Sequence, residues 1–292
     1  MDPHLLRTYV TVARLASFSA AARELGYTQS AVSQHIAALE QDLGAPLLGR
    51  RPVVPTPAGE RLLEHAAPLL LRMDAARADV IRMVAAPPSG VTLATTPTAL
   101  GPRVLAALPV SGVSVRVLGR DEIPAAVATG HADLGLVDGP AAPSDPLQLP
   151  DVAPLTSHAV AEEPLAVLLP TAHPLAGRAG LRLADLADAR WIDAPDAAVP
   201  LARLRAVNGG GAFRPALAYA GTDVRTLTAL VAGGHGLVLL PRFAAAAVPD
   251  TVAVPLAAPR LVHRTELLHA AGLAGAVGEL VEDLVGRLSA DR

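Results

Sequence analysis

The chain has 292 residues and a formal net charge of −3, and 51% of its residues are hydrophobic while 17% are charged. This balance is typical of a folded protein with two or three domains and excludes a disordered tail. Lysine and cysteine are absent, which excludes lysine chemistry, disulfides, thiol nucleophiles and cysteine metal sites. No signal peptide precedes residue 8 and no apolar run reaches the roughly 18 residues that span a bilayer, so we expect a cytoplasmic protein without membrane contact.

Residues 19–44 predict two helices joined by a tight turn. Ser19 is a candidate N-cap for a short helix over residues 20–25, and Gly26 suits the left-handed position that ends a helix. Thr28 is a candidate cap for the second helix. The pattern indicates a helix-turn-helix unit.

The second of these helices has one apolar and one polar face. Four apolar residues recur at spacings of four, three and four and are expected to be buried: Val32, Ile36, Leu39 and Leu43. The polar residues of its N-terminal half are expected to face outward: Gln29, Ser30, Ser33, Gln34 and His35. Amide and hydroxyl groups in this position are suited to base edges in the major groove of double-stranded DNA.

This segment and its flanks resemble the winged helix-turn-helix of LysR-type transcriptional regulators. The matching residues are Leu6, Val10, Val12, Ser17, Phe18, Ala21, Ala22, Leu25, Gln29, Ser30, Ala31, Ser33, Ile36, Leu39, Glu40, Leu43, Gly44, Leu47, Leu48, Thr56, Ala58 and Gly59. The resemblance implies that residues 1–57 form a DNA-binding domain, which works as a homodimer or homotetramer on an interrupted palindrome. A helical hairpin that only packs two core faces is the alternative.

The wing departs from the family pattern. The segment GRRPVVP is shorter than usual, and only Arg50 and Arg51 remain to contact backbone phosphates. Residues 1–57 hold five arginines and four acidic residues, which is close to neutral for a DNA-binding domain. We therefore expect modest affinity from each subunit and a contribution from oligomerisation.

Residues 58–86 predict one long helix, followed by a hinge that extends the linker to residue 90. Apolar residues alternate at spacings of four and three along it: Leu62, Ala66, Leu69, Met73, Ala76, Val80 and Met83. Such a seam needs a partner helix, and the resemblance implies that two linker helices pair in a dimer. Packing of the seam on the chain's own C-terminal domain is the alternative. Pro68 lies inside the helix and is expected to kink it.

Residues 91–292 alternate short apolar strands with helices, which is an α/β pattern. Strands are expected over 91–94, 113–118, 134–137, 165–169, 191–192, 216–219, 237–240 and 264–270, and helices over 97–108, 123–129, 223–232 and 277–288. The phrases GHADLGLV, EEPLAVLLPTAHPLAG, LRLADLADARWI and LVAGGHGLVLLP resemble the effector domain of the same family.

The resemblance implies two α/β subdomains related to periplasmic binding proteins. Subdomain I would span about residues 91–160 and 265–292, and subdomain II about residues 161–264, with crossing strands near 158–162 and 264–268. The expected fold class is therefore α/β with an all-α winged helix-turn-helix domain at the N-terminus and a long linker helix.

Four residues are candidates for an effector site. Ligands of open α/β sheets bind beyond the carboxyl ends of the strands, where the next helix begins. Thr96 and Thr98 stand at such a junction, Thr222 stands at the corresponding one in subdomain II, and Arg120 follows a strand. Helix N-termini and arginine favour a small anion, such as a carboxylate. Alternatively, the threonines are ordinary caps and Arg120 is a surface charge paired with its acidic neighbours.

Catalytic chemistry is not indicated. The nine histidines show no metal-binding spacing, no glycine-rich segment precedes a lysine, and the G-x-S-x-G pattern of hydrolases is absent. We expect no metal, cofactor or enzymatic activity. The prediction is an effector-responsive transcriptional regulator. The alternatives are a constitutive DNA-binding regulator with a vestigial cleft, and a small-molecule-binding module whose helix-turn-helix contacts proteins.

Overall fold

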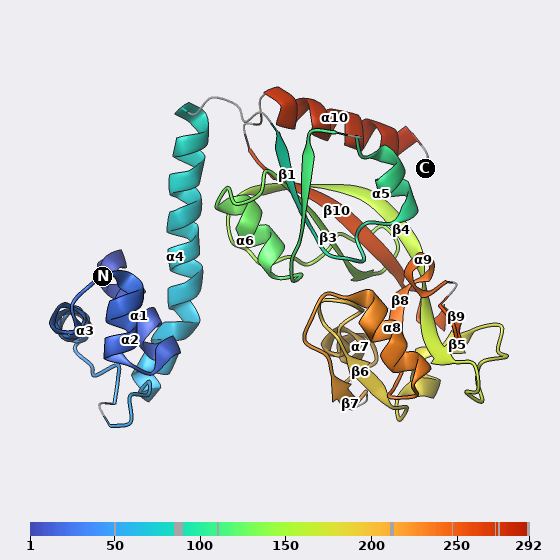
Figure 1. The fold of residues 1–292 in the computed structure, drawn as a ribbon, viewed down its shortest axis with the longest axis horizontal. Helices are drawn as coiled ribbons and strands as arrows, with labels where there is room; N and C mark the ends of the chain where they lie inside the picture. The colour runs from blue at the N-terminus through green and yellow to red at the C-terminus, as the bar shows by residue number, and fades with distance from the viewer. Residues whose placement is uncertain are drawn as a thin grey trace. The chain divides into compact units, whose positions relative to one another are not determined.

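A computed structural model describes residues 1–49, 51–84, 90–109, 111–210, 213–246, 248–271, 273 and 275–290 (Figure 1). The chain forms two compact units, Met1–Arg77 and Ala78–Arg292. Arg50 and residues 85–89, which belong to the expected wing and hinge, lie outside the described residues. Within the described ranges, no helix is long and apolar enough to cross a lipid bilayer.

The first unit contains helices whose ends are set by local capping. They are α1 (Pro3–Leu15), α2 (Phe18–Leu25), α3 (Gln29–Leu43) and the start of α4 (Pro57–Val84). The Thr28 hydroxyl accepts the Ala31 N–H at 3.2 Å, as expected for the cap of α3. Gly26 and Gly44 end α2 and α3 in the left-handed conformation, with φ of 71° and 68°.

The cap of α2 is Ser17, and the expectation of Ser19 was wrong. Ser17 has an extended backbone, and its hydroxyl accepts the Ala20 N–H at 3.2 Å. Phe18 is the first residue of the helix, and its side chain packs against the core of this unit. Ser19 therefore lies within the first turn of α2 and is exposed.

One apolar core holds this unit together. Its fully buried members include Tyr9 from α1, Ala21 from α2 and Ile36 from α3. Val32 and Leu39 are buried as expected, whereas Leu43 is 41% exposed because it lies in the last turn of α3, beyond the core. The wing after α3 is a single antiparallel bridge between Leu48 and Pro55.

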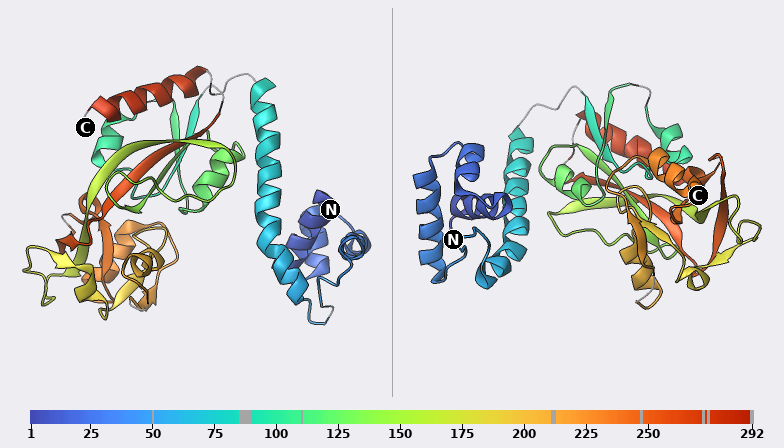
Figure 2. Two further views of the ribbon diagram at one scale, coloured as in Figure 1. Left: turned by 180° about the vertical axis from the view of Figure 1, so that it is seen from behind. Right: turned by 60° about the horizontal axis from the view of Figure 1, so that its bottom comes forward.

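The second unit is built on one eight-stranded sheet and one two-stranded sheet (Figures 1 and 2). The large sheet contains β1 (Val91–Thr95), β2 (Val113–Val117), β3 (Leu134–Ala141), β4 (Leu155–Pro170), β5 (Leu181–Arg182), β8 (Val238–Pro241), β9 (Thr251–Ala258) and β10 (Val262–Ala270). Their order is β2-β1-β3-β10-β4-β9-β5, and β8 also pairs with β4. The small sheet pairs β6 (Trp191–Asp193) with β7 (Pro215–Ala218).

Helices cover the sheets on both sides. They are α5 (Pro102–Ala107), α6 (Glu122–Ala128), α7 (Leu201–Val207), α8 (Val224–Ala232), α9 (Arg242–Ala245) and α10 (Gly275–Ala290), with a 3₁₀ turn over Leu183–Leu186. α5 and α10 pack on one face of β1, β3 and β10, and α6 packs on the other face (Figure 1). Separate clusters around Trp191 and Leu227 form the core of subdomain II.

The two strands expected to cross between the subdomains lie side by side as β4 and β10, and β4 continues into the second part of the sheet. β4 pairs with β10 over Leu155–Pro164 and then with β8 and β9 over Leu165–Pro170. β10 runs antiparallel to β4, with Glu162 opposite Arg264 and His158 opposite Leu267. β4 therefore belongs to both subdomains, and side chains at the crossing face residues of each.

Candidate functional site

The N-terminal half of α3 presents the predicted polar residues in different ways. Gln29, Ser30 and Gln34 are exposed, and Ser33 is half-buried. The Ser30 hydroxyl lies 3.0 Å from the Thr28 hydroxyl, within the cap of the helix. Gln29 and Gln34 thus place two exposed amide groups on the N-terminal half of α3, and amides are the type of group that reads base edges.

His35 does not face freely outward as expected. Its Nδ1 atom lies 3.1 Å from the Thr8 hydroxyl of α1, and its ring packs edge-on against Tyr27 with centroids 5.2 Å apart. The ring is half-buried as a result. His35 thus joins α3 to α1 and to the turn before α3, which fixes how α3 is presented.

Several charged side chains of the first unit form hydrogen bonds or ion pairs within that unit. Glu40 accepts the Leu47 and Leu48 N–H groups at 2.8 and 3.3 Å, so it holds the base of the wing to α3. Arg51 is exposed at the tip of the wing, beside the undescribed Arg50. Arg7 and Arg14 form ion pairs with acidic residues of α4 and α2.

The predicted seam of α4 divides into two parts. Ala66 is buried and Leu62 packs against the core of the first unit. The later members are exposed: Leu69 by 42%, Met73 by 48%, Val80 by 65% and Met83 by 87%. α4 continues as one helix through Pro68. A row of large apolar side chains thus lies exposed along the second half of α4.

The junction after β1 does not form the expected helix start. Thr96 closes a turn in which its hydroxyl accepts the Ala99 N–H at 3.1 Å, and α5 begins only at Pro102. Thr96 and Thr98 are fully buried. The Thr98 hydroxyl donates to Asp138, so it is not available as predicted.

At the corresponding junction in subdomain II, a side chain of the protein itself already binds the free N–H groups of the helix start. Asp223 caps α8 and accepts the N–H groups of Arg225 and Thr226 at 3.0 and 3.2 Å. The Thr226 hydroxyl also donates to Asp223 at 2.5 Å, and this bond together with the two backbone N–H bonds lowers the pKa of Asp223. Thr222 precedes this cap and is half-buried. A carboxylate of the chain therefore takes the position that the sequence suggested for an anionic ligand.

Arg120 is not a surface charge paired with its neighbours in sequence. Its guanidinium binds the carboxylate and the carbonyl oxygen of Asp138 on β3, and its backbone N–H donates to Asp196 Oδ1 at 2.9 Å. Nη2 lies 3.4 Å from the carbonyl oxygen of Ala198. Arg120 thus connects subdomain I, which carries Asp138, with subdomain II, which carries Asp196 and Ala198.

Asp138 is the centre of a buried polar cluster. His263 Nε2 lies 2.7 Å from its Oδ2 atom, which also accepts the Thr98 hydroxyl. Burial alone would raise the pKa of Asp138, but the charge of Arg120 and the imidazole of His263 outweigh burial and hold the pKa well below its usual range. The Nδ1 atom of His263 is buried without a partner among the described residues.

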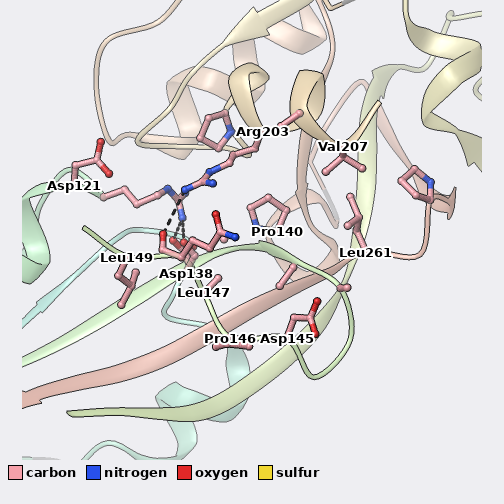
Figure 3. Close-up of a pocket in the computed structure, with 18 of the residues that line it drawn as sticks. Asp121, Asp138, Pro140, Asp145, Pro146, Leu147, Leu149, Arg203, Val207 and Leu261 are labelled. Atoms are coloured by element: carbon pink, nitrogen blue, oxygen red, sulfur yellow. Dashed lines mark hydrogen bonds and ion pairs between the residues drawn. The ribbon is translucent and has the colours of Figure 1, made fainter. Parts of the chain in front are cut away.

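A pocket of about 510 Å³ lies beside this cluster, between the two subdomains (Figure 3). In Figure 3, Arg203 and Val207 of α7 lie on one side, and Asp138, Leu147 and Leu149 lie on the other. Of the four predicted effector residues, only Arg120 lines it. Most of the remaining lining is apolar: Pro140, Ala141, Ala142, Pro146, Pro150, Pro200, Ala206, Pro259 and Leu261. Its polar members are Asp121, Asp145, Gln148 and Arg260.

Carboxylates of the crossing strands hold the loop that forms one wall of the pocket. Glu266 accepts the Leu147 N–H at 3.0 Å and the Ser157 hydroxyl at 2.5 Å. Arg264 donates to Glu266 at 2.6 Å and to Glu162 at 2.7 Å. Burial alone would raise the pKa of Glu266, but these hydrogen bonds outweigh it and lower the pKa. The wall is therefore attached to the strands that join the subdomains.

Sequence reasoning missed Asp138, His263 and Arg203. Asp138 had a detectable signal, because it is the one charged residue in the apolar phrase GLVDGP. A lone carboxylate in a buried strand requires a partner, which makes it a candidate for a buried cluster. His263 and Arg203 had no local signal of this kind.

Comparisons with known proteins agree with this geometry. The family described as "Bacterial regulatory helix-turn-helix protein, lysR family" matches residues 3–60, and "LysR substrate binding domain" matches residues 84–287. The chain is 30% identical to "Probable hydrogen peroxide-inducible genes activator" of Mycobacterium avium, over 94% of this chain and 93% of that protein. It is 29% identical to "HTH-type transcriptional regulator BudR" of Raoultella terrigena, over 83% and 85% of the two chains.

Solved structures share the fold along the whole chain. A Corynebacterium glutamicum OxyR C206 mutant matches with a TM-score of 0.52 and 24% identity, over 99% of this chain and 91% of that one. Full-length CbnR complexed with target DNA matches with a TM-score of 0.53 and 22% identity, over 99% and 100%. With both family descriptions matched in order, the chain belongs to the LysR family of DNA-binding transcriptional regulators and is not an enzyme.

Proposed function

We propose that this regulator binds an interrupted palindromic operator through α3 and changes its DNA contacts when a small molecule occupies the pocket between its subdomains. The observation that supports this most strongly is the apolar pocket at the subdomain boundary, attached through Glu266 to the strands that join the subdomains. A ligand that contacts both walls favours one arrangement of the subdomains over others. The protein would act in the cytoplasm, where the DNA is.

The chemistry of the pocket favours an effector with an apolar body and one anionic group. Prolines, leucines and alanines dominate the lining. Arg120 is neutralised by Asp138, whereas Arg203 and Arg260 line the pocket and are exposed, and the described hydrogen bond of Arg203 is a 3.4 Å contact with the carbonyl oxygen of Gln148. Arg203 is therefore the first candidate for a cation that binds a carboxylate of the ligand, and Arg260 is the second. The absence of cysteine excludes a thiol-based response to peroxide, despite the name of the Mycobacterium avium relative.

Effector binding can be tested by thermal unfolding of the full chain with a panel of small organic acids and their uncharged esters. We expect an acid of the right shape to raise Tm by about 5 °C or more at 100 times its Kd, and its ester to act weakly. Arg203→Ala should abolish the shift. Arg182→Ala, which removes an exposed arginine of β5 outside the pocket, should retain it.

Two results would contradict the effector proposal. If no compound shifts Tm or alters DNA binding, the protein is a constitutive regulator. If an active acid still acts on Arg203→Ala at the same concentration, Arg203 does not bind the ligand, and Arg260, which also lines the pocket, is the next position to examine.

The proposed DNA contacts divide into base reading and phosphate binding. Gln29, Ser30, Ser33 and Gln34 would face base edges, His35 would position α3, and Arg51 with Arg50 would meet phosphates. Gln34→Ala should cost about 1–3 kcal/mol on the operator and leave binding to random DNA nearly unchanged. Arg51→Ala should weaken both and reduce the salt slope by about one.

Binding-site selection from a random DNA library supplies the operator, and titrations at several salt concentrations then compare the variants. Equal losses on operator and random DNA for Gln34→Ala would contradict base reading. A protein that selects no sequence at all would favour the module whose helix-turn-helix contacts proteins.

A further inference from the structure

A hydrogen bond between the two helices of the helix-turn-helix fixes the side chain of Gln29. The Ser19 hydroxyl of α2 donates to Gln29 Oε1 at 2.9 Å. Both residues are exposed, so the bond lies on the surface and not in the core. Gln29 is the first residue of α3, at the end of the helix that enters the major groove in this motif.

Both partners stand on rigid parts of the backbone. Ser19 lies in the first turn of α2, and its carbonyl oxygen accepts from Arg23 Nε at 3.4 Å. The turn into α3 is held by the Tyr27 N–H, which donates to the Ala22 carbonyl at 2.9 Å, and by the Thr28 cap. The bond therefore favours, before DNA binds, the orientation of the Gln29 carboxamide in which its oxygen faces α2.

This orientation decides which group Gln29 offers to a base. The oxygen and nitrogen of the planar carboxamide lie on either side of the axis of the Cγ–Cδ bond, so an oxygen directed at α2 turns the NH₂ group to the other side. Bidentate pairing with adenine needs the amide oxygen as an acceptor together with one N–H donor. Guanine presents two acceptors, N7 and O6, and needs donors only.

We propose that Ser19 is a positioning residue that makes Gln29 a hydrogen-bond donor and so directs it to guanine rather than adenine. The inference rests on the proposed role of α3 in base reading. In this proposal Ser19 does not contact DNA itself. Gln29 pairs with guanine, whereas a glutamine considered alone would suggest adenine. Gln34 has no such partner in the described hydrogen bonds and keeps both pairing modes.

The test is binding-site selection from a random library with the full-length protein and the variants Ser19→Ala, Ser19→Thr, Gln29→Ala and the double variant Ser19→Ala/Gln29→Ala. The wild type should prefer guanine about tenfold over adenine at one position of each half-site. Gln29→Ala should remove this preference. Ser19→Ala should reduce it to about twofold or turn it towards adenine, and Ser19→Thr, which keeps the hydroxyl, should retain it.

The double variant separates positioning from direct contact. If Ser19 acts through Gln29, Ser19→Ala has no further effect when Gln29 is alanine. Replacing the selected guanine with 7-deazaguanine, which lacks the N7 acceptor, should weaken the wild type several-fold and leave Gln29→Ala unchanged. Ser19 is exposed, and an unchanged Tm of Ser19→Ala would show that the domain remains folded.

Each contrary result has a distinct meaning. If Gln29→Ala leaves the selected sequence intact, the proposed reading role of Gln29 fails. If Gln29→Ala changes the preference but Ser19→Ala does not, the positioning role alone is refuted. The same holds if Ser19→Ala weakens all sequences equally or still acts in the double variant.

Discussion

Among the described residues, Asp138 is the only carboxylate of the effector domain that contacts both a guanidinium and an imidazole. Its side chain is fully buried, so removing its charge leaves Arg120 without a counterion and weakens the hydrogen bond with His263. Asp138→Asn should therefore lower the unfolding free energy of this domain by about 3–5 kcal/mol at pH 7. Urea denaturation of the wild type and the variant measures the difference.

We expect the contribution of Asp138 to the free energy of unfolding to depend on pH. The pKa of Asp138 in the folded protein lies below its ordinary value of 3.8, so its contribution to stability is complete well above pH 3.8 and is lost as the pH falls below that value. The difference between the wild type and Asp138→Asn should thus be constant from pH 7 to about pH 5 and shrink towards pH 3. Asp121→Asn, which changes an exposed carboxylate, should show no such trend. A difference independent of pH would mean that the carboxylate is not stabilised in its charged form.

The limits of sequence reasoning are clearest at these residues. Arg120 could be predicted as a site residue because it follows a strand of an α/β sheet. Its environment could not, since Asp138 is 18 residues away and His263 is 125 residues from Asp138. Contacts at that separation depend on how β3 and β10 pair, which no local pattern records. The anion site expected at Thr98 was lost for this reason.

At the scale of elements, a helix could be predicted where its cap, apolar face and stop residue agree. Where two positions are equally suited to begin a helix, the sequence could not decide between them. α3 has a cap, an apolar face and a glycine stop that agree with one another. The helix expected from Pro97 begins instead at Pro102, although both prolines suit a first helical position. Gly101 is the extended N-cap of α5, and the Phe243 ring packs so closely against it that a Cβ atom there would lie 3.1 Å from the ring.

β4 shows a second effect of tertiary structure on an element. From the sequence we expect a crossing segment near residues 158–162 and a separate strand over 165–169, with Pro164 between them. In the fold it is one strand of 16 residues that exchanges β10 for β8 and β9 next to Pro164. A missing N–H is tolerated at that position because the ladder changes partners there. The pocket depends on this continuity, since both subdomains share the strand.

At the scale of the whole molecule, weak charge in the DNA-binding unit and exposed apolar residues on α4 point to the same assembly. Residues 1–57 are nearly neutral, and Arg7 and Arg14 are already paired within the unit. One copy therefore gains little from phosphate contacts. Two copies joined through α4 would bind two half-sites, and the second contact becomes intramolecular.

The last prediction tests this assembly with charges placed in the exposed row. Leu69→Glu combined with Met73→Glu should give monomers, because a carboxylate buried in a helix interface has no partner there. Light scattering measures the mass, and titration with the selected operator should show an affinity loss of about 100-fold or more, the size of the avidity term.

Ala67→Glu is the control, since Ala67 is exposed on α4 but outside the seam. Because Leu62 and Ala66 pack in the core of the first unit, they are poor positions for this test, whereas Val80 is a second suitable one. A double variant that remains a dimer with folded domains would show that α4 is not the interface, and a monomer that binds the operator as tightly as the wild type would show that avidity does not compensate for the weak charge.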